Sequence, residues 1–80
     1  MRVVETGKTY KHFKGNYFKV LFIGYDSENN DKDGNPVKLV AYESSHDGKI
    51  WIRPYDNFIE KVDKEKYPNA EQEYRFELVD

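Results

Sequence analysis

The sequence has no cysteine, which excludes disulfide bonds and thiolate ligands for a metal. Its two histidines lack the spacing to further ligands that a zinc site needs. Its five glycines are dispersed singly, so there is no glycine-rich loop that cradles phosphate. Because these motifs are missing, no metal and no cofactor is expected.

Long apolar runs and an excess of either charge are also missing. No stretch approaches the roughly 18 apolar residues of a membrane-spanning helix, and residues 1–5 do not resemble the apolar core of a signal peptide. The formal net charge is −2 with 35% charged residues, whereas a general nucleic-acid binder is usually basic. The composition therefore predicts a soluble, cytoplasmic protein with a surface of mixed charge and no membrane partner.

Aromatic residues, in contrast, are abundant. Seven tyrosines, five phenylalanines and one tryptophan make up 16% of the 80 residues. Each buried aromatic side chain removes about 150–250 Å² from water, so these rings can build a core in a chain this short. We expect residues 1–80 to form a single domain.

Short β-prone runs between turn signals predict an all-β protein. The run 17–25 is expected to be a central, curved strand with Phe18, Val20 and Phe22 on one face. Pro54 should end the preceding strand and start one helical turn over residues 55–58. No stretch has convincing helical periodicity, so the expected fold is a small barrel or sandwich of five to six strands. Strands are expected at 9–13, 17–25, 37–44, 50–53 and 73–79, and loops at 14–16, 26–36, 45–48 and 63–72.

Several short motifs follow one another in a specific order: Tyr10-x-His12-Phe13-Lys14-Gly15, Ser27-Glu28, Val40-x-Tyr42, Trp51-x-Arg53-Pro54, Phe58, Lys61-Val62 and Arg75-Phe76. Together they resemble a small bacterial family known only as a domain of unknown function, numbered 1653. The resemblance covers roughly residues 7–77 and implies a compact SH3-like β-barrel without an established activity. Where many members have His-Ser-Glu this chain has Asp26-Ser27-Glu28, so a role that needs an imidazole there does not carry over. The hairpin 29–38 also looks longer than usual.

Arg53 is the strongest candidate for a binding residue. It lies close to Trp51 and Tyr55 in the sequence, and a guanidinium can stack on an aromatic ring while it binds a carboxylate or phosphate. The alternative is a structural ion pair with Glu28 or another acid. If the strands close into a barrel, the ends of three strands meet at one rim. The ligand-binding residues expected there are His12, Lys14, Glu28, Tyr42, Trp51 and Arg53, with Tyr10 and Arg75 nearby.

His12 has two interpretations. An imidazole titrates near neutrality and can act as a general base or donate to a ligand, but a half-buried, hydrogen-bonded histidine beside Tyr10 and Phe13 is equally ordinary. His46 is expected in a solvated turn. The acidic segment 26–33 lacks the spacing of a calcium-binding loop, and no serine lies in a nucleophile elbow. No catalytic residue is therefore assigned.

Three functions follow from these residues. The leading hypothesis is a small binding module whose rim takes an anionic or peptide-like ligand, so that its partner is a peptide, a protein or a small anion. The second is binding of RNA or another single-stranded nucleic acid through Lys11, Lys14, Arg53 and neighbouring aromatics. The third is a small enzyme in which His12 and Glu28 form an acid–base pair, which requires that the two side chains converge in one pocket.

Overall fold

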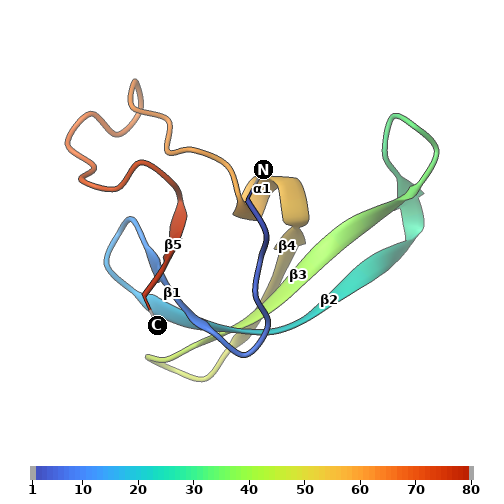
Figure 1. Ribbon diagram of the computed structural model, residues 1–80, viewed down its shortest axis with the longest axis horizontal. Helices are drawn as coiled ribbons and strands as arrows, with labels where there is room; N and C mark the ends of the chain where they lie inside the picture. Colours follow the sequence, from blue (N-terminus) through green and yellow to red (C-terminus); the bar gives the residue numbers. More distant parts are fainter. Residues whose placement is uncertain (1, 80) are drawn as a thin grey trace.

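Residues 2–79, which the computed structural model describes, form one curved antiparallel sheet and a single helical turn (Figure 1). The all-β class, a set of five strands and the helical turn after Pro54 are confirmed. The order across the sheet is β4-β3-β2-β1-β5, and no pairing within residues 2–79 joins the edges β4 and β5 into a closed ring. The elements are β1 (Thr9–His12), β2 (Tyr17–Asn30), β3 (Pro36–Ser44), β4 (Ile50–Pro54), α1 (Tyr55–Phe58) and β5 (Phe76–Leu78). No helix in this part of the chain is long and apolar enough to cross a membrane.

The β2–β3 hairpin is longer than the sequence suggested, and it projects from the rest of the sheet as an arm (Figure 1). Residues 26–36 were expected to be a loop, but β2 continues to Asn30 and β3 begins at Pro36. The register is irregular between Tyr25 and Asn30, and the two strands pair again at Asn30 and Pro36 despite the polar composition of this segment. The turn itself lies where the Asp-Gly pair predicted it: Gly34 has φ 84°, and the Asp31 carboxylate accepts from the N–H groups of Asp33 and Asn35.

An irregularity in β2 reverses the expected direction of one aromatic ring. Val20 pairs with Tyr42, but Phe22 pairs with Ala41, so the register shifts between Val20 and Phe22. Such a bulge breaks the alternation of faces. Ile23 thus packs against the core, while Phe22 is 55% exposed. The prediction that Phe22 shares a face with Val20 is wrong for this reason.

Aromatic rings form the centre of the core. The rings of Phe58, from α1, and Phe76, from β5, stack with their centroids 4.1 Å apart. Tyr10 and Tyr42 meet Phe58 edge-on at 5.4 and 5.5 Å, a geometry that aromatic quadrupoles favour. Tyr10, expected near the rim, is instead buried in this cluster. The buried hydrophobic cluster consists of Val4, Tyr10, Val20, Val40, Tyr42, Phe58 and Phe76.

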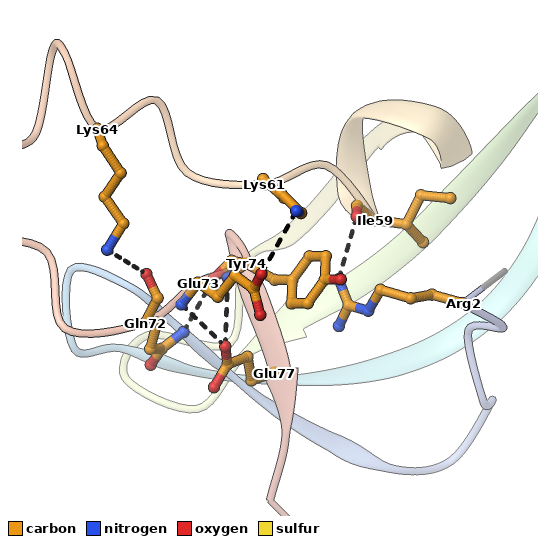
Figure 2. A network of polar contacts seen from close by, with 8 residues as sticks. All are labelled: Arg2, Ile59, Lys61, Lys64, Gln72, Glu73, Tyr74 and Glu77. Carbon is orange, nitrogen blue, oxygen red and sulfur yellow. Dashed lines mark hydrogen bonds and ion pairs between the residues drawn. The ribbon is translucent and has the colours of Figure 1, made fainter.

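The segment after α1 is fixed to the rest of the fold by polar contacts (Figure 2). The Arg2 guanidinium donates to the carbonyls of Ile59 at 3.1 Å and Phe76 at 2.6 Å, and it lies 3.9 Å from the centre of the Tyr74 ring. Lys64 donates to the carbonyl of Gln72, across the loop expected at 63–72. The last strand is shorter than the expected 73–79, because Tyr74 forms only an isolated bridge before β5 begins.

Candidate functional site

A cavity of about 430 Å³ is lined by residues from all five strands and from the β1–β2 turn. Trp51 and Arg53 of β4 and Phe76 of β5 line it, so it lies between the two edges of the sheet. Five of the six residues expected to bind a ligand are brought together here, and the sixth, Glu28, is not. The complete lining is His12, Lys14, Asn16, Phe18, Tyr42, Trp51, Arg53 and Phe76.

Arg53 is held in the wall by neutral groups. Its Nε donates to the Tyr42 hydroxyl at 2.7 Å and its Nη1 donates to the Asn57 amide oxygen at 2.8 Å. Its guanidinium carbon lies 5.1 Å from the centre of the Phe76 ring and 5.7 Å from that of Tyr42. These rings are not the Trp51 and Tyr55 rings expected from sequence proximity. A guanidinium has five N–H donors in a rigid fork, so Arg53 is oriented and still has donors for a ligand.

Among residues 2–79, no acid lines this cavity or pairs with its cations. Within residues 2–79 the ion pairs are Lys61–Glu73 and Arg75–Glu60, and no carboxylate is in the lining. Lys14 lines the cavity, and its ammonium lies 5.1 Å from the centre of the Tyr67 ring. A cavity with cations and no carboxylate favours a negatively charged occupant.

His12 is a neutral member of the wall. Burial first, and then the nearby positive charges of Arg53, Lys14 and Arg75 in that order, together lower its pKa from 6.5 to about 4. The Lys14 backbone N–H donates to Nδ1 at 3.1 Å, so the proton of the neutral ring is on Nε2. The ring packs 4.9 Å from Phe76 and 4.5 Å from Phe13. His12 can therefore donate one hydrogen bond to a ligand near neutral pH.

Glu28 lies on the β2–β3 arm, away from this wall. Its backbone N–H donates to the Asp26 carboxylate, and its side chain is neither in the lining nor paired with Arg53. The convergence that an acid–base pair of His12 and Glu28 requires is therefore not observed. Arg75, another residue expected nearby, pairs with Glu60 at 3.4 Å instead of lining the cavity.

Sequence reasoning missed four residues that build or support the site. Phe18 and Phe76 had been assigned to strands and Asn16 to a turn, and all three line the cavity. Asn57, which orients Arg53, follows it by four positions across the predicted helical turn. That spacing was a usable signal for Asn57. Finding the other three required the register between strands.

The chain belongs to the family described as a protein of unknown function, DUF1653, whose model matches residues 8–78. The comparison with curated proteins and the comparison with solved structures each gave no match. The family match covers every strand and the whole cavity lining, while Arg2 and Val4, which pack against the fold, precede it.

Proposed function

We propose that this protein is a small binding module that takes an anionic group in the cavity between β4 and β5. The observation that carries this proposal is Arg53: a guanidinium in the cavity wall, oriented by the neutral groups of Tyr42 and Asn57. Because this guanidinium has no acid partner among residues 2–79, an anionic ligand can neutralise its charge. Carboxylate and phosphate are the anions whose geometry fits the guanidinium fork.

The rest of the wall fits an anion attached to an apolar or planar body. Trp51 is half exposed, and Phe18 and Phe76 supply further aromatic surface. Ligand pockets combine such apolar walls with a few converging polar groups. In this cavity the polar groups are Arg53, Lys14 and the Nε2–H of His12.

The other two hypotheses find less support in the geometry. The basic residues proposed for RNA do not all line one cavity, because Lys14 lines the candidate site with Arg53, whereas Lys11 lines a different cavity with Lys14. A single-strand platform needs a continuous basic groove along the backbone. The enzyme hypothesis requires His12 and Glu28 in one pocket, but the cavity that contains His12 is not lined by Glu28.

The test uses the only tryptophan of the chain as a reporter, because Trp51 lines the cavity. Inorganic phosphate and acetate, titrated separately against the parent protein, are expected to change its fluorescence saturably. Arg53→Met removes the charge and is expected to weaken binding at least about tenfold, because hydrogen bonds to charged groups contribute about 1.5–3 kcal/mol. Arg53→Lys keeps the charge and loses the guanidinium fork, so its affinity for the anions should lie between those of the parent and Arg53→Met.

Arg75→Met is the matched control, since it removes the same charge from an arginine that pairs with Glu60 outside the cavity wall. We expect its affinity for either anion to stay within about threefold of the parent. Circular dichroism and thermal melting check that each variant is folded. Equal binding by the parent and by folded Arg53→Met and Arg53→Lys proteins would refute the proposal, as would the lack of a saturable response to both anions.

A further inference from the structure

The two edges of the sheet differ in how they are covered. The β5 edge is partly occupied: the Phe76 carbonyl accepts from Arg2, and just before the strand the Arg75 N–H donates to the Glu60 carbonyl at 3.0 Å (Figure 2 shows Arg2 beside this segment). The β4 edge pairs with β3 on one side, and on the other side no strand within residues 2–79 pairs with it. The uncovered edge is therefore the one that carries Trp51 and Arg53.

The phase of the β3–β4 hydrogen bonds shows which backbone groups face outward. The Ser44 N–H donates to the Lys49 carbonyl at 2.9 Å, and these residues continue the β3–β4 register. Hydrogen-bonded and non-hydrogen-bonded pairs alternate in an antiparallel ladder. Trp51 and Arg53 thus bond to β3, whereas the N–H and C=O groups of Ile50 and Ile52 point away from it. Pro54, which has no N–H, also belongs to a pair that is not hydrogen-bonded to β3.

The outward edge of β4 also has little of the usual protection against pairing. Charged side chains, prolines and bulges normally blunt an exposed edge. Here Ile50 and Ile52 are 58% and 60% exposed, and only Pro54 interrupts the edge, at its end. On the other face of β4, the side chains of Trp51 and Arg53 line the cavity. An added strand would thus find free hydrogen-bonding groups, apolar side chains on one face and a cationic cavity on the other.

We propose that an extended peptide with an acidic side chain adds to β4 as a further strand and places its carboxylate beside Arg53. This inference rests on the proposed function, and it identifies the anion as part of a peptide. Neighbouring strands lie about 4.8 Å apart, so a side chain on the inner face of the added strand lies next to Trp51 or Arg53. Backbone bonds to Ile50 and Ile52 would supply affinity, and the charge of the cavity would supply selectivity.

The test separates the backbone contact from the anion contact. The probe is a fluorescein-labelled peptide in which valine and glutamate alternate, followed by anisotropy. Ile52→Pro removes the outward N–H and adds a ring at the edge, so peptide affinity should fall at least about tenfold. Ile52→Val keeps the N–H and a β-branched side chain and should stay within about twofold. Phosphate binding, reported by Trp51, should be unchanged in both variants because Ile52 is outside the cavity lining.

Changes in the peptide make the test independent of whether Ile52→Pro folds. N-methylation of the alternate residues whose N–H groups would bond to β4 should abolish binding to the parent protein, as should replacement of every glutamate by lysine. Unchanged affinity after N-methylation would overturn strand addition, and so would phosphate binding without peptide binding. Failure of both probes would overturn the proposed function as well. A dimer in sedimentation that dissociates in Ile52→Pro would show that a second copy takes this edge instead of a peptide.

Discussion

Protonation of His12 should make the stability of this protein depend on pH in a defined window. The folded-state pKa is about 4 against 6.5 for an ordinary histidine, first because of burial and then because of Arg53, Lys14 and Arg75. Between these two values the unfolded chain takes up a proton that the folded protein does not. Lowering the pH from 6.5 to 4 therefore favours unfolding, and His12 contributes no further change below pH 4.

The size of this effect follows from the two pKa values. At about 1.4 kcal/mol for each tenfold change in the acid constant, the difference between 6.5 and about 4 corresponds to about 3 kcal/mol. His12 is only partly buried, and water screens the charges around it. We therefore expect the His12 contribution to fall by about 1–2 kcal/mol across the window.

The assay is urea unfolding at a series of pH values for the parent and His12→Gln. Carboxylates titrate in the same window, so the prediction concerns the difference between the two proteins, which should change by about 1–2 kcal/mol between pH 6.5 and pH 4. His46→Gln is the matched control, because His46 is in an exposed turn, and its pH profile should follow that of the parent. NMR titration of the His12 ring gives the pKa directly. A measured pKa near 6.5, or identical profiles for the parent and His12→Gln, would refute the reasoning.

The same titration connects His12 to the anion site. Arg53→Gln removes the largest of the charge contributions, so the pKa of His12 should rise above 4 but stay below 6.5, because burial persists. Saturating phosphate in the parent should also raise this pKa, since an anion in the cavity stabilises the imidazolium. An unchanged pKa in phosphate would show that the anion does not bind beside His12.

Three further predictions concern stability, measured as the free energy of unfolding in urea. Phe58→Ala should cost about 3–5 kcal/mol, because it leaves a void against Phe76 in the centre of the core; a loss below about 1 kcal/mol would contradict the packing. Gly34→Ala should cost about 1–2 kcal/mol because φ is 84° there, whereas Gly24→Ala, which meets only a ring carbon of Phe22 at 3.9 Å, should change little. Arg2→Ala should cost about 1–3 kcal/mol through its two carbonyl contacts, against less than about 1 kcal/mol for Lys61→Ala in an exposed ion pair.

Much of the fold follows from local sequence signals. The absence of helical periodicity and the alternation of β-prone residues predicted an all-β protein. The expected strands 37–44 and 50–53 lie within the observed elements, and the expected strand 9–13 runs one residue past β1. Pro54 determined where β4 ends, and Gly34 and Gly48 mark turns because their φ angles are positive. These features depend on backbone chemistry within a few residues, so a sequence displays them directly.

The candidate site was predictable in part. An arginine between aromatic residues singled out Arg53, and the strand alternation placed Trp51 on the same face. The sequence could not show that Tyr42 and Asn57, rather than an acid, would hold the guanidinium. It also grouped Glu28 with the site, whereas the residue is on a strand whose other end lines the cavity.

The tertiary structure decided the features that depend on pairing between distant segments. A bulge after Val20 turned Phe22 outward and Ile23 inward, and β2 and β3 pair again at Asn30 and Pro36, within a segment that looks like a loop. The same pairing left β4 as an uncovered edge beside a cationic cavity. Local sequence determines which residues can form strands and turns. The register and order of those strands are set by the long-range contacts that bury the most apolar surface, and these exist only in the folded chain.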